Sequence, residues 1–509
     1  MSRLKGCTIL ALAVGMLLVV GMFGLAAEPK YGGTLKVALW QAIDSLDPQG
    51  SVHLPFWHSA LFSVWEPLIR YVAGEEVYQP LLAKSWEFKD DQTLVMHLQQ
   101  GVEFHDGTTF NAQDVKFTVE RMQDPDTAAP NARFVEMIGE VAVLDDYTVE
   151  FRLTKPYGGI LTNLDFLVML SSENPPSPDS DPVGTGPFQF VEWIPGDHLV
   201  LEAFDDYWQE GLPYLDELHF IIMPDVQTRL ANLEADTIQY ITDIAPEQVD
   251  RIEMNATLKL IEGLPNMLNL THFVTDVPPM DNILIRRAVA HCMDRQGYLE
   301  AVLNGVGTVS ENIYSPANPY YNSLTEEMYP YDLERAKALF DAAGYPENFP
   351  EDAYPLRVTV PAGNVPLEKA AVLLQSSLRS IGIECEIEKY DLPTWLRLRE
   401  TRPMIITYYS YGGVDPSVQL STNLISPGGN LPHYYDEKFA QLIQEGYAAT
   451  DFEVRKQVYY RIQEKIACDV PFAIWSFYPK VGAMRSYVEG IWMQPSWSCP
   501  VYHEAWLNK

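Results

Sequence analysis

The sequence predicts an α/β protein with at least two lobes and an additional small α+β domain. The chain has 509 residues, which is enough for several hydrophobic cores. Residues 356–388 show a strand, a helix and a second strand in succession, which is typical of parallel α/β structure. Residues 70–180 instead show hairpin patterns with a helix between them. Two different kinds of unit therefore share the chain.

Acidic side chains strongly outnumber basic ones in this chain. There are 69 Asp and Glu residues against 35 Lys and Arg residues, which gives a formal net charge of -34. Such a charge repels a phosphate backbone, so we expect no nucleic-acid partner. For the same reason a neutral or cationic ligand is favoured over an anionic one.

Residues 1–27 have the pattern of a signal peptide. Arg3 and Lys5 precede an apolar run from Ile9 to Ala27 that contains no acidic residue. The pattern predicts export to a periplasmic or other extracytoplasmic compartment. An uncleaved anchor is the alternative, because about 20 apolar residues can span a bilayer. Cys7 lies too early to be a lipid-anchor cysteine at the cleavage site.

Alternating apolar residues predict the first strands. Leu35, Val37 and Leu39 share one face of a strand. Two hairpins follow, turning at Asp90-Asp91 and at Asp145-Asp146.

The region around and after these hairpins contains a helix and an irregular crossing. Asn111 is a predicted helix cap, with Asp114 placed favourably in the first turn. The proline-rich residues 171–188 predict a surface crossing without regular structure. A further hairpin then turns at Pro195-Gly196-Asp197.

The second half contains the clearest α/β unit. A strand through Val358 is followed by a helix that Gly382 ends and by a strand through Cys385, which predicts a right-handed parallel crossover. Ligands bind at the carboxyl ends of such strands, so the turn at residues 361–364 is a candidate cleft wall. An aromatic strand is predicted at residues 471–479.

The helix that precedes this aromatic strand shows an apolar stripe. Its members are Val454, Val458, Ile462 and Ile466.

The motifs of common secreted enzymes are missing. The chain has no HExxH, GxSxG or GxxxxGK[ST] sequence. Cys499 and His503 are only a weak nucleophile–base pair, and the cysteines beyond the signal form no CxxC motif. These cysteines, Cys292, Cys385, Cys468 and Cys499, are predicted to be buried thiols or to form one or two bridges. We therefore predict no enzyme activity, no catalytic residue, no metal and no cofactor.

Aromatic residues next to predicted cleft-forming turns are the best ligand candidates. Such side chains stack on ligands and also offer a polar edge. The candidates are Trp40, Trp395, Tyr408, Tyr409 and Tyr411. Packing in a core is the alternative for each of them.

Several longer motifs, in this order, resemble bacterial solute-binding proteins of the peptide/nickel class, family 5. The motifs are GGTLKVAL, SLDP, WEPLIRY, PLLAKSWEF, GVEFHDGTTFNAQDVKFTVERM, VGTGPFQFVEW, PPMDNILIRRAVAHCMDR, YDLERAKALFDAAGY and LLQSSLRSIGIECEIEKYD. The resemblance extends over nearly the whole chain after the signal. It implies a receptor that delivers a ligand to an ABC permease in the membrane, and we expect a monomer.

The resemblance also implies a type II periplasmic-binding-protein-like fold, in which two lobes close around a hinge. On this basis the expected division is a signal peptide at 1–27; lobe I at 28–69, 183–270 and 480–509; an extra domain of hairpins and helices at 70–182; and lobe II at 271–479.

The ligand expected from the resemblance is a peptide, although two anchors are missing. Relatives hold the peptide's amino group with an Asp placed four residues before the Pro of the motif that matches residues 414–417, and this position is Gly412 here. Asp415 could substitute if the loop shifts. The turn at 361–364 also lacks the Arg that dipeptide receptors use for the carboxylate. An oligopeptide is therefore favoured over a dipeptide; a neutral oligosaccharide is the alternative, and a secreted hydrolase a remote one.

Two further candidates are placed by the same resemblance. Tyr478 matches a ligand-facing hinge position at one crossover between the lobes, and Thr185 is expected at the other. A purely structural role is the alternative for both residues.

Overall fold

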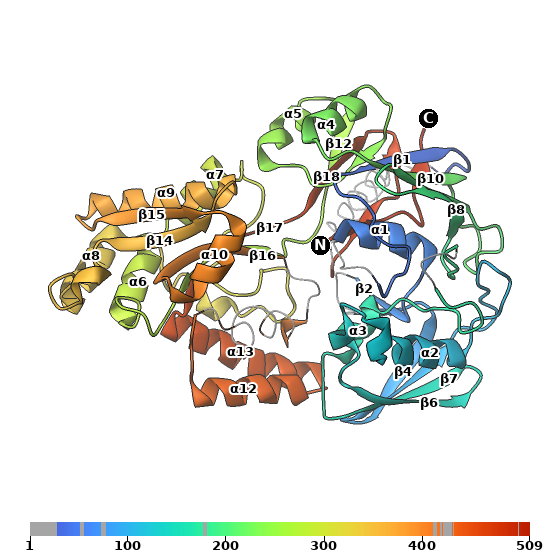
Figure 1. Ribbon diagram of the computed structural model, residues 1–509, viewed down its shortest axis with the longest axis horizontal. Helices are drawn as coiled ribbons and strands as arrows, with labels where there is room; N and C mark the ends of the chain where they lie inside the picture. Colours follow the sequence, from blue (N-terminus) through green and yellow to red (C-terminus); the bar gives the residue numbers. More distant parts are fainter. Residues whose placement is uncertain are drawn as a thin grey trace, which may run out of the picture.

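The structure is a computed structural model, and it describes most of the chain after the predicted signal. The described residues are 28–50, 55–72, 78–176, 181–410, 415–417, 420, 430, 432–496 and 498–509. The predicted signal peptide at 1–27 lies outside them. Figure 1 shows a five-stranded sheet with its helices on the left, and a seven-stranded and a four-stranded sheet on the right. Within the described residues, no helix is both long and apolar enough to cross a membrane.

The seven-stranded sheet contains the strand predicted around Val37. Its strands, in spatial order, are β12 (Leu258–Glu262), β18 (Val481–Arg485), β11 (Tyr240–Ile241), β1 (Thr34–Leu39), β10 (Glu217–Ile222), β9 (His198–Ala203) and β8 (Phe188–Ile194). Leu35, Val37 and Leu39 are fully buried in one core, as the alternation predicted. Ala38 points into a second core on the other face, together with residues of α4 (Val226–Glu234) and α5 (Val249–Glu253).

The four-stranded antiparallel sheet confirms both predicted hairpins. Its order is β4 (Ala83–Asp90), β5 (Thr93–Leu98), β7 (Thr148–Leu153) and β6 (Ile138–Asp145). The helix α2 (Ala112–Gln123) packs on it and begins at the predicted cap. Asn111 accepts from the backbone of Gln113, and Asp114 accepts from the backbone of Asn111, which closes a capping box.

Short elements connect this small sheet to the rest of the chain. The strands β2 (Ile69–Tyr71) and β3 (Tyr78–Pro80) pair with each other, and α3 (Ile160–Phe166) lies against β2. The helix α1 (Pro55–Val64) packs near β8 and β21 (Cys499–Val501). In the proline-rich stretch, the described residues form no helix or strand before β8 begins at Phe188.

The five-stranded sheet contains the predicted parallel crossover. Its order is β15 (Cys385–Tyr390), β14 (Leu356–Pro361), β16 (Met404–Ser410), β13 (Met267–Phe273) and β17 (Phe472–Tyr478). The strands β14 and β15 pair in parallel across α9 (Val365–Ser380), so the predicted unit is confirmed. The helices near this sheet include α6 (Ile283–His291), α7 (Arg295–Ala301), α8 (Leu333–Ala343) and α10 (Leu392–Leu398).

Two helices, α12 (Glu437–Ala448) and α13 (Phe452–Asp469), pack against each other beside this sheet. The predicted apolar stripe of α13 is wrong at its first member, because Val454 is 58% exposed. Steps of four residues rotate by about 40° each around a helix, so a series of four drifts off one face. The buried face instead runs through Arg455, Val458 and Ile462.

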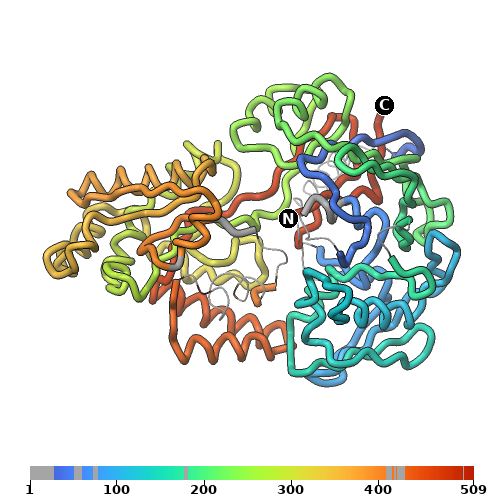
Figure 2. The backbone as a smooth tube through the Cα atoms, in the orientation of Figure 1, coloured from blue at the N-terminus to red at the C-terminus, as the bar shows by residue number. Residues whose placement is uncertain are grey.

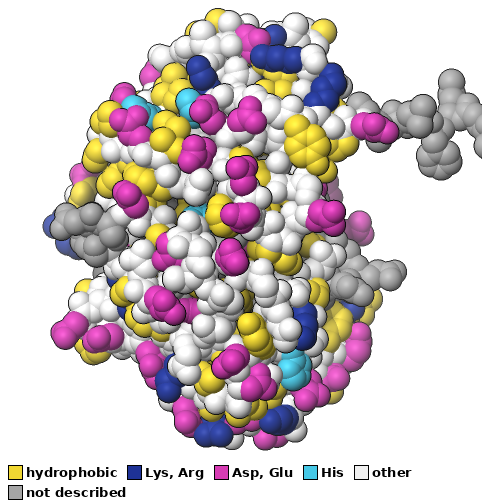
Figure 3. Space-filling model, turned by 90° about the vertical axis from the view of Figure 1, so that its right-hand side faces the viewer, with side chains coloured by type: hydrophobic (Ala, Val, Ile, Leu, Met, Phe, Trp, Pro, Cys, Tyr) yellow, Lys and Arg dark blue, Asp and Glu magenta, His cyan; other side chains and the backbone are white. Residues whose placement is uncertain are grey.

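All four cysteines after the signal are free thiols in the structure. Cys292, Cys385 and Cys499 are buried, as predicted, but the prediction of a buried or bridged cysteine is wrong for Cys468, which is exposed. Burial raises the pKa of each of these three thiols to about 12, which keeps them protonated at neutral pH. Figure 3 shows acidic side chains scattered over the face it presents, without gathering in a single patch.

Candidate functional site

Two chain segments join the seven-stranded sheet to the five-stranded sheet. The strand β12 leads into β13 through residues 263–266, and β17 leads into β18 through residues 479–480. The two segments run side by side (Figure 2), and the Gly263 N–H donates to the Lys480 carbonyl at 3.0 Å. Together they form one two-stranded connection between two sheets that have separate cores, which is the arrangement of a hinge.

One edge of the five-stranded sheet lies next to this hinge. The strands β14, β15 and β16 run in parallel, and their carboxyl ends share that edge with Tyr478, the last residue of β17. Met267, the first residue of β13, pairs with both Ser410 and Tyr478 there. The turn at 361–364, a predicted cleft wall, follows β14 at the same edge.

The turn at 361–364 offers backbone groups and no basic side chain. Asn364 caps α9, and the Gly363 N–H donates to Glu368 Oε1 at 2.8 Å. Lys389 on β15 forms an ion pair with Glu368 at 2.6 Å. The charge of this lysine is therefore balanced within its own lobe.

The facing edge of the seven-stranded sheet carries Trp40. The strand β1 is parallel to β10 and β11, so Trp40 lies at the same edge as Thr242, which follows β11. The Ile244 N–H donates to the Val481 carbonyl at 2.9 Å, which places this edge beside the hinge. Trp40 is 39% exposed. The two edges that flank the hinge are therefore the candidate ligand-binding region, and they are called the cleft edges below.

Tyr408 and Tyr409, both predicted as ligand contacts, lie near the hinge-side edge of the five-stranded sheet. In β16 the backbone of Tyr408 pairs with Asn269 and that of Tyr409 with Leu268. Tyr411 lies outside the described residues. Tyr478 is partly buried and packs at the border of the core of this sheet. The structure therefore brings Trp40 and the backbones of these strand ends to the two sides of one hinge.

Thr185 lies elsewhere, inside the first lobe. Its side chain is fully buried, and its hydroxyl donates to Glu66 Oε2 at 3.1 Å. Glu66 also accepts from Tyr207 at 2.7 Å and from Trp208 at 2.9 Å, and burial raises its pKa above the usual value. The expected position of Thr185 at a crossover between the lobes is wrong, because the chain crosses at 263–266.

Trp395 is placed in a core. It is 4% exposed and packs with Val274 and Ile405 on the five-stranded sheet. Val274 follows the last residue of β13 and bonds to Pro403, ahead of β16. Tyr390, the last residue of β15, packs against the same cluster.

Asp415 forms a buried ion pair that the sequence did not reveal. Asp415 is 4% exposed and Arg455, on α13, is 2% exposed. The Arg455 guanidinium donates to both carboxylate oxygens, one of them at 2.9 Å. Burial alone would lower the pKa of Arg455, but the Asp415 carboxylate and two tyrosines raise it well above its usual value. The carboxylate is thus neutralised within the second lobe.

The signal for this pair was present in the sequence. Positions 455, 458, 459, 462 and 466 are a regular helical face, and an arginine on a buried face requires a carboxylate or several carbonyls nearby. The predicted stripe was placed through Val454 because that residue is apolar, and this left Arg455 off the predicted buried face.

The structure does not bring Cys499 and His503 together as a nucleophile and base. The Cys499 thiol donates to Gln494 Oε1 at 3.4 Å, and His503 Nε2 bonds to the Phe62 carbonyl at 2.8 Å. Among the residues that the structure describes, no group of histidines, cysteines and acids is arranged to hold a metal ion.

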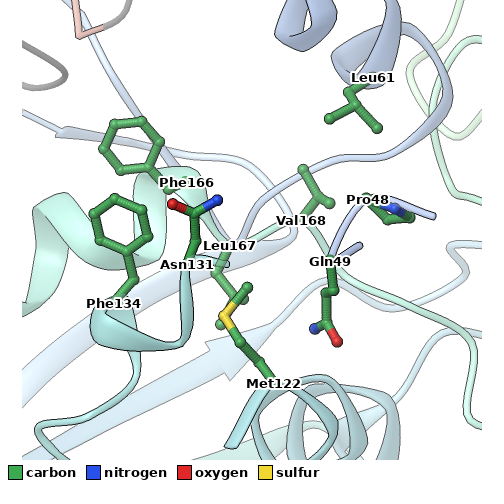
Figure 4. Close-up of a pocket in the computed structure, with 9 residues that line it drawn as sticks. All are labelled: Pro48, Gln49, Leu61, Met122, Asn131, Phe134, Phe166, Leu167 and Val168. Carbon is green, nitrogen blue, oxygen red and sulfur yellow. The ribbon is translucent and has the colours of Figure 1, made fainter. Parts of the chain in front are cut away.

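A small hollow lies where the four-stranded unit meets the first lobe (Figure 4). Its volume is about 20 Å³, which is enough for one water molecule and far too small for a peptide. Its lining residues are Pro48, Gln49, Leu61, Met122, Asn131, Phe134, Phe166, Leu167 and Val168. This hollow is therefore distinct from the ligand cleft.

Two α/β lobes joined by a two-stranded hinge, with strand ends facing each other across it, define the class of the protein. The fold is that of the type II periplasmic binding proteins, and these bind solutes between their lobes. The structure of the substrate-binding protein CtaP of Listeria monocytogenes matches with a TM-score of 0.85 and 23% identity, over 94% of this chain and all of that one.

The sequence comparisons give the family. The profile of the bacterial extracellular solute-binding proteins, family 5 Middle, matches residues 77–430. The chain therefore belongs to family 5 of these proteins, as its motifs predicted. Members of this family are the substrate-binding components of ABC importers, and they are not enzymes.

Individual relatives differ in the ligands for which they are named. The chain is 30% identical to heme-binding protein A of Haemophilus influenzae, over 80% of each chain. It is 28% identical to the dipeptide-binding protein of Escherichia coli, over 85% of this chain and 87% of that one. The periplasmic binding protein DppA of Helicobacter pylori, in complex with the peptide STSA, matches with a TM-score of 0.73 and 26% identity, over 94% of this chain and 99% of that one.

Proposed function

We propose that this protein captures an oligopeptide outside the cytoplasm and delivers it to an ABC permease. The observation that carries this proposal is the match to peptide-binding relatives along nearly the whole chain, lobes and hinge included. The proposal includes export by residues 1–27 and action as a monomer.

An oligopeptide is favoured over a dipeptide by the charges at the turn 361–364 and at Asp415. A dipeptide presents both of its charged termini within one short ligand, so its receptor needs a cation and an anion close together. The turn at 361–364 has no basic residue, and Lys389 is paired with Glu368. The Asp415 carboxylate is occupied by Arg455. A longer peptide can instead be held through hydrogen bonds along its own backbone, without a charged anchor for each terminus.

The binding mechanism is closure of the lobes about the hinge. A ligand that touches both the Trp40 edge and the Tyr478 edge stabilises the closed arrangement more than the open one. The permease then recognises the closed, loaded protein. Trp40 would stack on the ligand from the first lobe, and Tyr478 with the tyrosines of residues 408–411 would contact it from the second.

Mass spectrometry of compounds released from the purified protein by denaturation tests the ligand class. We expect peptides of three or more residues. Titration calorimetry with dialanine, trialanine and pentaalanine should show measurable binding for the longer peptides alone. Recovery of an oligosaccharide, or binding of maltotriose or cellotriose without peptide binding, would replace the peptide with the neutral sugar alternative. A saturable shift of the Soret band of hemin on titration with the protein would indicate heme, the ligand for which the Haemophilus relative is named.

A further inference from the structure

The two halves of the molecule meet at a second place besides the hinge. The α12–α13 pair approaches the loop that precedes α3 (Figure 1), and the contact centres on Gly158. The Gly158 N–H donates to the Tyr447 carbonyl at 2.8 Å. The Gly158 carbonyl accepts from Arg455 Nη1 at 3.1 Å. Both polar groups of this residue are therefore bonded to the opposite lobe.

Only glycine fits at this position. A Cβ atom on Gly158 would overlap the carbonyl oxygen of Ala449, which is backbone and cannot rotate away. It would also lie 3.0 Å from Arg455 Nε. The two backbones thus approach each other more closely than any side chain at residue 158 would allow.

The Arg455 side chain, which bonds to Gly158, is also fixed by several partners in its own lobe. Its Nε donates to the Gly446 carbonyl at 3.0 Å, and Asp415 holds the other end of the guanidinium. The rings of Tyr320 and Tyr459 lie 5.8 and 5.5 Å from its central carbon. These partners all belong to the second lobe, and Gly158 is the partner that belongs to the first half of the chain.

Two weaker contacts surround this centre. Thr450, between α12 and α13, donates to Asp91 Oδ1 at 3.2 Å. The rings of Tyr157 and Tyr447 meet edge to face with centroids 6.5 Å apart. The contact therefore has a partly buried polar centre and a looser rim.

We propose that these residues, Tyr157, Gly158, Tyr447, Ala449 and Arg455, form a latch that holds the lobes closed. The latch joins the halves at a place separate from the hinge, and among the described residues no chain segment crosses between the sheets there. Rotation of the lobes about residues 263–266 and 479–480 separates its two sides and breaks both hydrogen bonds. The latch thus shifts the equilibrium toward the closed state in addition to the ligand's own effect. This inference rests on the closure proposed above. It adds that the latch favours the closed state even without ligand.

A disulfide trap measures the latch without any ligand. Asp91→Cys and Thr450→Cys are introduced into protein that carries Cys7→Ser and Cys468→Ser, which removes the exposed thiol; the buried cysteines stay. Because the two native side chains are in contact, the new thiols should form a disulfide under mild oxidation in the closed state. Cross-linking is followed over time on non-reducing gels.

Gly158→Ala in this background should slow cross-linking by about tenfold or more, because the added methyl excludes the closed contact. Gly139→Ala, in β6 of the same small sheet, is the matched control and should cross-link like the parent. Circular dichroism and thermal melts establish that each variant is folded. If Gly158→Ala does not fold, Arg455→Lys keeps a charge for Asp415 but lacks the second donor for Gly158, and should also slow cross-linking.

Two results would overturn the latch. One is a parent protein that fails to cross-link without ligand, and the other is a folded Gly158→Ala protein that cross-links at the parent rate. Neither result bears on which ligand is bound, and the identity of the released ligand does not bear on the latch. Failure of the latch and failure of the peptide assignment are thus separate outcomes.

Discussion

The Gly263 amide hydrogen bonds to the Lys480 carbonyl, and this single bond ties together the two segments that connect the lobes. On one side of it Glu262 pairs with Val481, and on the other Met267 pairs with Tyr478. Because the two segments are bonded to each other, they must bend together. In the closure proposed above, the lobes would therefore rotate about this one short region.

The first prediction concerns the packing of this hinge. A Cβ on Gly263 would lie 3.0 Å from both Cβ and Oγ of Ser498, which has a left-handed φ of 48°. Gly263→Ala should lower the free energy of unfolding by about 1–2 kcal/mol. Ser498→Gly removes the clashing atoms and suits the left-handed backbone, so it should restore most of that loss in the double variant. Urea unfolding of the four proteins measures the coupling, and strictly additive effects would contradict this packing.

The second prediction concerns the buried pair of Asp415 and Arg455. Asp415→Asn leaves the guanidinium charged and buried without its counter-ion. We expect a loss of about 3–5 kcal/mol in the free energy of unfolding at pH 7. The double variant Asp415→Leu with Arg455→Met replaces both charges by apolar groups and should recover most of this loss. A cost below about 1 kcal/mol for Asp415→Asn would show that the pair is solvated.

The strands and the crossover could be predicted from the sequence because alternation and helical spacing are local properties. The parallel pairing of β14 with β15 and the capping box at Asn111 both follow from short stretches of chain. The roles of aromatic residues could not be predicted in this way. Trp40 and Trp395 occupy similar places next to predicted turns, yet one is 39% exposed and the other 4% exposed.

The position of Thr185 shows the same limit. A threonine between two glycines is compatible with a ligand loop, but Glu66 is its partner, and this residue is 119 positions away in the sequence. Long-range partners of this kind depend on how the domains pack. Arg455 and Gly158, which are 297 positions apart, depend on it even more.

The third prediction concerns acid stability. Burial lowers the pKa of His503 from 6.5 to about 3, and the charge of Arg70 adds to the effect. The folded state therefore binds fewer protons than the unfolded state between these values. Stability is fully present above pH 6.5 and is lost as the pH falls toward 3.

His503→Gln removes this titration and keeps a donor for the Phe62 carbonyl. Between pH 7.5 and pH 4.5 the wild-type protein should lose about 3 kcal/mol more unfolding free energy than His503→Gln. Other titrating groups are shared by both proteins and cancel in the comparison. Equal losses in urea unfolding at the two pH values would mean that His503 is protonated in the folded protein.

The last prediction separates a cleft tryptophan from a core tryptophan. Trp395→Ala removes a buried side chain that packs on Val274 and Ile405, so it should lower the free energy of unfolding by about 3–5 kcal/mol. Trp40→Ala removes a partly exposed side chain at the cleft edge, and it should cost much less stability. Its effect should appear in binding, because an aromatic surface that stacks on the ligand is lost.

We expect Trp40→Ala to weaken the binding of tri- to pentaalanine by about tenfold or more, which corresponds to about 1.4 kcal/mol. Trp395→Ala, measured at a temperature where it is still folded, should bind these peptides within about threefold of wild type. Titration calorimetry and urea unfolding on the same preparations give both quantities. If Trp40→Ala binds like wild type and Trp395→Ala does not, the ligand binds beside Trp395 and not at the edge that carries Trp40.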